Sequence, residues 1–185
     1  MAKSVVLTGA GRDRVGIVAE LAEMLFDMGC NLLDSSMTLL RGEFAIILMI
    51  RLPESISVEN LKGRIGQIET KLGLTIHIRE LSEQELNQST EDQGLSYIVS
   101  VYGADRPGIV SGVTKELASM AVNITDVATQ FSGDINSQSK NVFVMVLEAT
   151  APANVTEEAL RKRLLEVSSR LSVDISLQAL EVVEL

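Results

Sequence analysis

Two short and nearly identical segments carry the residues with the clearest chemical potential. Asp13–Val18 has the sequence Asp-Arg-Val-Gly-Ile-Val, and Asp105–Val110 repeats it as Asp-Arg-Pro-Gly-Ile-Val. Each follows a β-prone stretch and precedes apolar residues at helical spacing, so each is predicted to enter a helix. The start of a helix offers free backbone N–H groups and a positive dipole end, which together suit a carboxylate. Gly16 and Gly108 carry no side chain, so a small ligand could approach the backbone closely there.

The flanking residues have both a structural and a binding interpretation. Asp13 and Asp105 suit the N-cap, where a carboxylate accepts hydrogen bonds from free N–H groups, and Pro107 fits the first helical turn. In the structural interpretation, the acids and glycines only cap helices and close tight turns. Arg14 and Arg106 are interpreted first as solvated side chains and second as partners for a ligand carboxylate.

An asparagine follows each predicted helix. Asn31 and Asn123 are predicted to open the next strand, and an amide side chain donates to an acid and accepts from an amine. With the helix N-terminus, a nearby Asn would hold both ends of an α-amino acid. The alternative is a left-handed cap at the C-terminus of the preceding helix. The candidate ligand-binding residues are Gly11, Asp13, Arg14, Gly16, Ile17 and Asn31 in the first copy, and Gly103, Asp105, Arg106, Gly108, Ile109 and Asn123 in the second.

The two segments belong to a repeat that spans the chain. The copies are offset by 92 residues through the first helix and the Asn, and by 99 residues afterwards, because the second copy has extra residues between Phe131 and Lys140. Ser82–Gly94 contains four acids, no base and Leu86 as its only hydrophobic residue, which indicates a solvated linker. We expect a first domain over residues 1–81, an acidic linker over 82–94 and a second domain over 95–185.

Within each copy the hydrophobic pattern alternates between the periods of a strand and a helix. The predicted order is βαββαβ, twice, which gives an α+β fold of two ferredoxin-like domains, each an antiparallel four-stranded sheet with two helices on one face. The predicted strands are Ser4–Gly9, Asn31–Leu40, Phe44–Leu52 and Leu74–Leu81, then Tyr97–Tyr102, Asn123–Phe131, Asn141–Thr150 and Val173–Leu180. The predicted helices have apolar faces over Ile17–Met28, Ser57–Leu72, Ile109–Met120 and Thr156–Leu171, with Ser57 and Thr156 as N-caps.

The composition disfavours several classes of function. The net charge of −9, from 25 acids and 16 bases, argues against a surface that binds nucleic-acid phosphates, and 3% aromatic residues argue against base stacking. One His and one Cys cannot build a structural zinc site or a disulfide. Gly9-Ala-Gly11 lacks the third Gly of a dinucleotide-binding motif, because Arg14 takes its place. We expect no metal, no cofactor and no direct contact with nucleic acid.

The sequence also offers no membrane segment. Its longest unbroken apolar run is Phe44–Ile50, seven residues, whereas about 20 are needed to span a bilayer. The apolar stretch after Lys3 is too short for the core of a signal peptide. We expect a cytoplasmic protein without a membrane partner.

A family resemblance rests on the doubled Asp-Arg-Val/Pro-Gly-Ile-Val turn, on the later Asn-Leu-Leu-Asp and Asn-Ile-Thr-Asp segments, and on the βαββαβ order. These features resemble tandem ACT domains over nearly the whole chain except the linker. The resemblance implies a regulatory module that binds amino acids at interfaces between domains. A chain of two ACT domains is similar to the glycine cleavage system transcriptional repressor family, which implies a ligand sensor acting through a DNA-binding protein partner. Val15 departs from the Pro of the usual turn.

We therefore predict a non-enzymatic regulator that senses a small amino acid, with glycine or serine as first candidates, and that controls transcription through a protein partner. The edge strands of the two sheets would pair within the chain or across a homodimer. One alternative is a regulatory subunit of an amino-acid biosynthetic enzyme. Another is a small enzyme on the same scaffold, which would need a nucleophile or a paired acid and base that the sequence does not offer.

Overall fold

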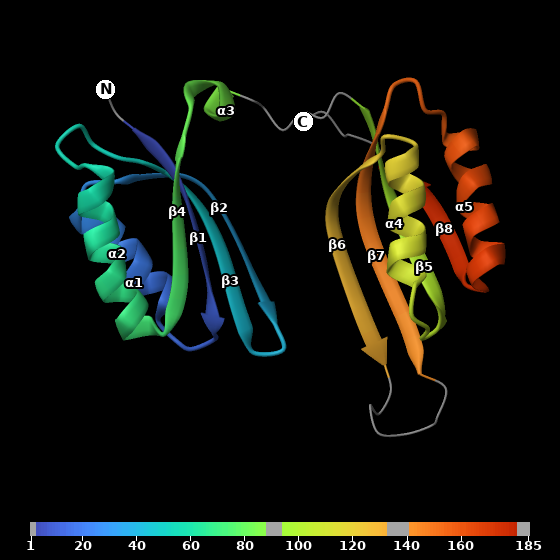
Figure 1. Ribbon diagram of the computed structural model, residues 1–185, viewed down its shortest axis with the longest axis horizontal. Coiled ribbons are helices and arrows are strands. Elements are labelled where there is room, and N and C mark those ends of the chain that lie inside the picture. The colour runs from blue at the N-terminus through green and yellow to red at the C-terminus, as the bar shows by residue number, and fades with distance from the viewer. Residues whose placement is uncertain (1–2, 88–93, 133–140, 181–185) are drawn as a thin grey trace. The chain divides into compact units, whose positions relative to one another are not determined.

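The protein, seen in a computed structural model, is described over residues 3–87, 94–132 and 141–180. The chain divides into two compact units, residues 1–89 and 90–185. Each unit has the predicted βαββαβ order, which is confirmed (Figure 1). The first unit contains β1 (Ser4–Arg12), α1 (Ile17–Asp27), β2 (Asn31–Leu40), β3 (Glu43–Arg51), α2 (Val58–Leu72) and β4 (Leu74–Leu81). The second contains β5 (Gly94–Ala104), α4 (Ile109–Ser119), β6 (Asn123–Ser132), β7 (Val142–Pro152), α5 (Glu157–Leu171) and β8 (Asp174–Ala179).

Each sheet is antiparallel, with the strand orders β2-β3-β1-β4 and β6-β7-β5-β8. In each unit both helices lie on the same side of the sheet (Figure 1). The arrangement confirms the predicted α+β class and ferredoxin-like topology. It leaves β2 and β4 as the edges of the first sheet, and β6 and β8 as the edges of the second.

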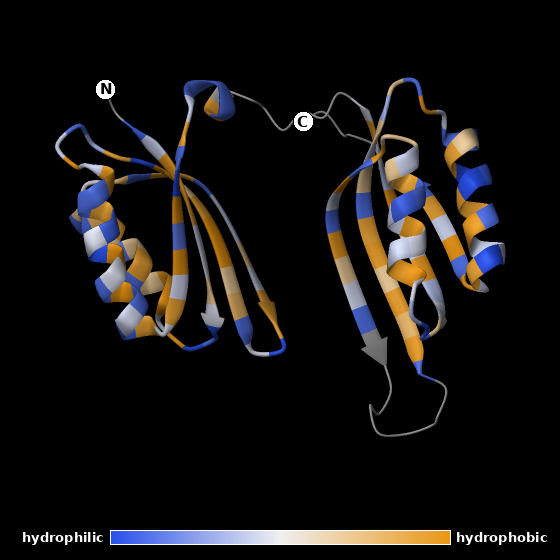
Figure 2. Ribbon diagram, viewed as in Figure 1, coloured by the Kyte–Doolittle hydropathy of each residue, from blue (hydrophilic) through white to orange (hydrophobic). Residues whose placement is uncertain are grey.

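The core of each unit lies between the sheet and its helices. In the first sheet Leu7 pairs with Leu48, and both side chains are buried against the helices. Alternate residues of the central strands point into this layer because side chains alternate across a strand. Figure 2 shows the resulting apolar stripes on the helices. The buried helical residues are Ile17, Leu21, Met24 and Leu25 of α1, Val58, Leu61, Ile65 and Leu72 of α2, Ile109, Val113 and Leu117 of α4, and Leu160, Leu164 and Val167 of α5.

The second helix of each unit begins at its predicted cap. The Ser57 hydroxyl accepts a hydrogen bond of 3.1 Å from the backbone N–H of Asn60, and the Asn60 side chain accepts one of 3.2 Å from the backbone N–H of Ser57. The Thr156 hydroxyl accepts a hydrogen bond of 3.2 Å from the backbone N–H of Ala159. Both predictions are therefore confirmed, and each cap satisfies an otherwise orphaned donor.

A short helix, α3 (Glu83–Asn87), occupies the first part of the expected linker. Glu85 accepts a hydrogen bond of 2.9 Å from the backbone N–H of Ser82, and its own N–H donates to the Ser82 hydroxyl at 3.3 Å. The Arg79 guanidinium also lies 2.5 Å from the Glu85 carboxylate. The hydrogen bond from the backbone of Ser82, followed by that from Arg79, lowers the pKa of Glu85 to about 2. Residues 88–93 of the expected linker, and residues 133–140 in the stretch that holds the extra residues of the second copy, lie outside the described residues.

Candidate ligand-binding turns

The two repeated turns have the same backbone conformation. Gly16 has φ 99° and ψ −8°, and Gly108 has φ 99° and ψ −9°. Such a positive φ is natural for glycine and costly for other residues. Val15 of the first turn stands where the second has Pro107, and the two turns are alike all the same. The departure of Val15 from the usual Pro therefore leaves the conformation of the turn unchanged.

The N-caps of the two helices are the glycines and not the aspartates. Neither α1 nor α4 has a side-chain cap, so the predicted capping role of Asp13 and Asp105 is wrong. Instead, the backbone N–H of Asp13 donates to the carbonyl of Gly42 at 2.9 Å, and that of Asp105 donates to the carbonyl of Asn141 at 3.0 Å. These bonds tie each turn to the neighbouring β-strand connection. Pro107 precedes the N-cap glycine, so it lies before the helix and not in its first turn as predicted.

The first turns of α1 and α4 keep their N–H groups available. The carbonyl of Gly16 accepts the first helical hydrogen bond from Glu20 at 2.9 Å, and that of Gly108 accepts from Gly112 at 2.8 Å. The earlier N–H groups have no helical partner by geometry, and no side chain caps them. A Cβ built on Gly16 or Gly108 would meet nothing within 4 Å. Each turn therefore combines available donors with open space, which suits a small anion.

Other candidates in the turns have a packing role. A Cβ on Gly11 would lie 2.7 Å from the carbonyl oxygen of Gly73, and one on Gly103 would lie 2.8 Å from Cγ1 of Val173. Each of these glycines therefore leaves room for the residue that precedes the last strand of its unit. The side chains of Ile17 and Ile109 are each 2% exposed and belong to the cores. Only their backbone N–H groups are placed to contact a ligand.

The two arginines differ. The guanidinium of Arg14 donates a hydrogen bond to the main-chain carbonyl of Lys71, near the end of α2. The Lys71 ammonium lies 2.7 Å from the carboxylate of Glu20 in the first turn of α1. Arg14 is therefore engaged with the protein and is not simply solvated. Arg106 is exposed, and its side chain forms no hydrogen bond or ion pair with the described part of the chain.

The structure does not bring Asn31 together with the turn of its own unit. Asn31 opens β2 and pairs with Arg51, which pairs with Ser4 at the start of β1. The turn, in contrast, follows Arg12 at the end of β1, beside Leu40 at the end of β2. Asn31 and the turn therefore lie at opposite ends of the sheet. The reason is that α1 runs back along the sheet, over 11 residues at about 1.5 Å each.

The second unit repeats this separation. Asn123 pairs with Thr150, which pairs with Ser96, whereas Ala104 at the turn pairs with Val142. The left-handed capping role considered for the asparagines is also wrong, because both open strands. The left-handed backbone conformation occurs instead two residues before each asparagine, with φ 67° at Gly29 and φ 57° at Ala121.

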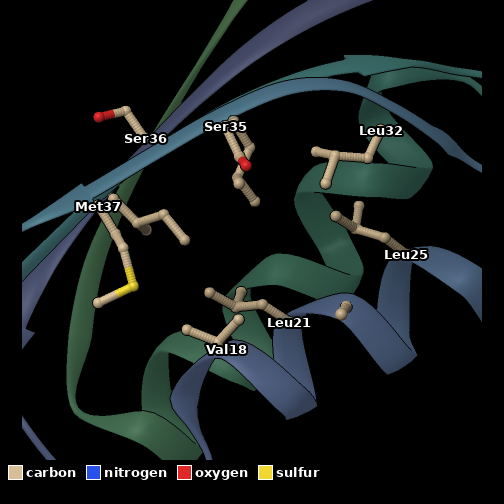
Figure 3. Close-up of a pocket in the computed structure, with 10 residues that line it drawn as sticks. Val18, Leu21, Leu25, Leu32, Ser35, Ser36 and Met37 are labelled. Carbon is tan, nitrogen blue, oxygen red and sulfur yellow. The ribbon is translucent and has the colours of Figure 1, made fainter.

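A further hollow, which the sequence did not indicate, lies between α1 and β2. Its volume is about 150 Å³. Figure 3 shows Val18, Leu21 and Leu25 of α1 facing Leu32 and Met37 of β2, while Ser36 points away. The sequence signal that could have pointed to it is the pair Leu32-Leu33, which breaks the alternation of a half-buried strand and contributes Leu32 to the lining. The lining residues are Val18, Leu21, Ala22, Leu25, Leu32, Ser35, Ser36, Met37, Ile46 and Leu48.

Three other features carry no chemistry of their own. His77 is exposed on β4, and Cys30 packs partly against the core, where burial raises the pKa of its thiol. Two basic residues of α5 form ion pairs, Arg161 at 2.6 Å from Glu157 of the same helix and Arg163 at 2.7 Å from Glu116 of α4, which favours a solvated helix face. Within the described residues, no group of His, Cys, Asp and Glu side chains could hold a metal ion. None of the described helices has the length and apolar character needed to cross a bilayer.

Comparison with known proteins identifies relatives for both units. The chain is 22% identical over 176 residues to the glycine cleavage system transcriptional repressor of Escherichia coli, covering 92% of this chain and 88% of that protein. It is 37% identical over 82 residues to a UPF0237 protein of Methanopyrus kandleri, covering 44% of this chain and 83% of that protein.

Two solved structures match nearly the whole length of the chain. A structure described as an unknown protein from Galdieria sulphuraria has a TM-score of 0.78 at 27% identity, covering 98% of this chain and 100% of its own. A protein provisionally named as a glycine cleavage system transcriptional repressor has a TM-score of 0.74 at 19% identity, covering 98% and 99%; at that identity it shows the fold alone. The ACT domain model matches residues 3–79 and again 96–178. The chain therefore belongs to the ACT-domain family, with two ACT domains in tandem.

Proposed function

We propose that this protein is a non-enzymatic regulator that senses a small amino acid through its ACT domains. The observation that supports the proposal is the pair of identical turns at Gly16 and Gly108, each with an uncapped helix N-terminus and open space above the glycine. The carboxylate of the ligand would accept hydrogen bonds from these N–H groups, where the helix dipole also favours a negative charge. The candidate turns are Gly11–Ile17 and Gly103–Ile109, and the candidate asparagines are Asn31 and Asn123.

The position of the asparagines adds a geometric requirement. Asn31 lies at the far end of its own sheet from the Gly16 turn. A ligand that is held by both would need an Asn from another edge strand. An antiparallel neighbour of β2 would place its own beginning beside the end of β2, next to the turn. This supports a ligand site that is completed only when two edge strands pair.

The process that this protein regulates is proposed from the name of a related protein and from the net charge of the chain. The E. coli relative is named as a transcriptional repressor of the glycine cleavage system, and the net charge of −9 opposes direct binding to DNA phosphates. We therefore propose control of transcription through a protein partner such as a DNA-binding regulator. A gel-shift assay should show no DNA complex at moderate salt. A transcription factor in a pull-down from the native cytoplasm would support the proposal, whereas a biosynthetic enzyme would favour the alternative of a regulatory subunit.

Titration calorimetry tests the sensing role. Glycine and serine are titrated first into the full chain, followed by the other amino acids. We expect one of them to bind, and we expect its amide, which lacks the carboxylate, not to bind. Gly16→Ala and Gly108→Ala, each tested singly, should reduce the affinity of the turn that is altered. Failure of every amino acid to bind a folded protein would contradict the sensing role.

A further inference from the structure

A hollow of about 500 Å³ lies at one end of the second sheet, where β5 ends and where β7 and β8 begin. In the strand register Tyr102 pairs with Asp174, and Ala104 pairs with Val142. Because side chains alternate across a strand, these four side chains share one face of the sheet, opposite to the buried Val101. Both helices of the unit lie on the other face (Figure 1). The hollow therefore includes the face of the sheet that carries no helix.

Two acceptors in the hollow are unpaired within the described part of the chain. Oδ1 of Asn141 is buried and accepts no hydrogen bond from any described residue. The carboxylate of Asp174 is exposed and forms no hydrogen bond or ion pair with the described residues. Tyr102 is 54% exposed and offers an aromatic face, which attracts cations. The hollow therefore combines an amide acceptor, a carboxylate and an aromatic ring, which together suit an organic cation.

The first unit fills the same corner with its own guanidinium. The carbonyl of Gly42 accepts the backbone hydrogen bond of the first turn, and the carbonyl of Asn141 accepts that of the second, so the two residues are equivalent. Nη1 of Arg12 lies 3.4 Å from the position that a Cβ on Gly42 would take. The same nitrogen lies 3.1 Å from the carboxylate of Glu43. A guanidinium is therefore held at this corner in the first unit.

The second unit has lost this guanidinium and carries acceptors in its place. Ala104 stands at the position of Arg12, and Val142 stands at that of Glu43. Asp174 stands where the first copy has a threonine. The corner thus changes from a balanced pair of charges to a single negative charge, which suits a cation from outside the unit.

We propose that this hollow binds a guanidinium compound with an apolar stem. The guanidinium would take the place that Arg12 takes in the first unit. It would form an ion pair with Asp174 and donate to Oδ1 of Asn141, whose amide rotates easily about χ2. The stem would lie on Val142 and on the ring of Tyr102. A planar guanidinium suits several acceptors at once better than a compact ammonium does, and the net charge of −9 further favours a cation.

The site in the hollow does not depend on the proposed amino-acid sensing. The turn at Gly108 offers N–H donors, which suit an anion, whereas the hollow offers acceptors, which suit a cation. The two sites therefore select groups of opposite charge. A cation without a carboxylate tests the hollow alone, so its failure to bind would leave the sensing role intact.

An NMR titration of the full chain with butylguanidinium tests the site. We expect the signals of the Asn141 side-chain amide and of the Asp174 backbone to shift together, with a dissociation constant in the millimolar range. Butylurea has the same stem without the charge and should leave these signals unchanged. The absence of shifts with butylguanidinium, or equal shifts with butylurea, would overturn the proposal. Butylammonium should bind more weakly, and equally tight binding would overturn the assignment to a guanidinium.

Variants locate the binding site. Asp174→Asn should weaken binding by about 5-fold, because it removes one exposed ion pair. Asp126→Asn is the matched control, since it removes the same charge near the start of β6, and it should bind as the native chain does. Ala104→Arg combined with Val142→Glu rebuilds the ion pair of the first unit and should abolish binding. Circular dichroism checks that each variant is folded. Equal affinity in the two aspartate variants would overturn the proposal.

A further titration identifies the source of the guanidinium. N-acetylarginine methylamide carries the peptide groups that flank an arginine within a protein. Tighter binding of this compound than of butylguanidinium would assign the hollow to an arginine side chain of a partner protein. Weaker binding would assign it to a free guanidinium compound. Under either assignment, Asp174→Asn should weaken binding.

Discussion

A hydrogen bond between Arg14 and Lys71 joins the Gly16 turn to the end of α2, a helix that lies far away in the sequence. The guanidinium of Arg14 donates to the main-chain carbonyl of Lys71. Carbonyls in the last turn of a helix have no helical partner, and a cation there also interacts favourably with the helix dipole. Arg14 therefore stabilises the end of α2 at the same time as it fixes one side of the turn.

This contact predicts different consequences for two equivalent arginines. Arg14→Ala should lower the free energy of unfolding of the first unit by about 0.5–1 kcal/mol. Arg106→Ala should change the stability of the second unit by less than about 0.5 kcal/mol, because Arg106 is an exposed residue without a partner among the described residues. Urea unfolding monitored by residue-specific NMR separates the two units. Equal effects would show that the bond from Arg14 contributes little.

The positive φ of Gly16 and Gly108 predicts that any side chain at these positions lowers the stability of its unit. Gly16→Ala and Gly108→Ala should each destabilise their unit by about 1–2 kcal/mol, although the new Cβ meets no atom within 4 Å. Gly63→Ala in the middle of α2 is the matched control, since its Cβ would also meet nothing. That variant should stabilise the first unit by about 0.5–1 kcal/mol. The urea midpoint of unfolding should therefore fall for Gly16→Ala and Gly108→Ala and rise for Gly63→Ala.

The space around Gly11 and Gly9 predicts different costs for adding a side chain at these two positions of β1. A Cβ on Gly11 would lie 2.7 Å from the backbone oxygen of Gly73, whereas a Cβ on Gly9 would only touch side chains of Ile46 and Ile76 at 3.4 Å. Backbone atoms cannot yield cheaply, so Gly11→Ala should cost about 1–3 kcal/mol. Gly9→Ala should cost clearly less. Thermal unfolding of both variants tests the order, and a Gly9 variant that is the less stable of the two would contradict it.

The helix α3 should be sensitive to acid. The pKa of Glu85 is lowered to about 2, so its folded-state bonds stabilise α3 fully above the ordinary pKa of 4.5 and are lost as the pH falls from 4.5 toward 2. We expect NMR signals of the Ser82 amide, which donates to Glu85, to follow this titration. Glu85→Gln should abolish the pH dependence, and Glu83→Gln should retain it. Persistence of the titration in the Glu85 variant would assign it to another group.

Much of the fold follows from local patterns in the sequence. The repeat of Asp13–Val18 at Asp105–Val110 established two copies, and the alternation of periods predicted the order of every strand and of the four long helices. Ser57 and Thr156 were recognisable as caps because capping depends on a few neighbouring residues. The helix α3 was missed, although Ser82 and Glu85 have the spacing of a capping box, because the acidic composition of that stretch indicated a linker.

The sequence alone determined that the chain has two βαββαβ copies, that each contains a glycine turn at the start of a helix, and that Asn31 and Asn123 begin the following strands. Only the tertiary structure decided which of these residues are neighbours. Strand register places Asn31 and the Gly16 turn at opposite ends of one sheet, and helix packing places Arg14 on the carbonyl of Lys71. The physical reason is that proximity in a folded chain depends on the direction in which each element runs, which spacing along the sequence does not record. The same holds for β2, because only the strand order shows that this strand is an edge of its sheet.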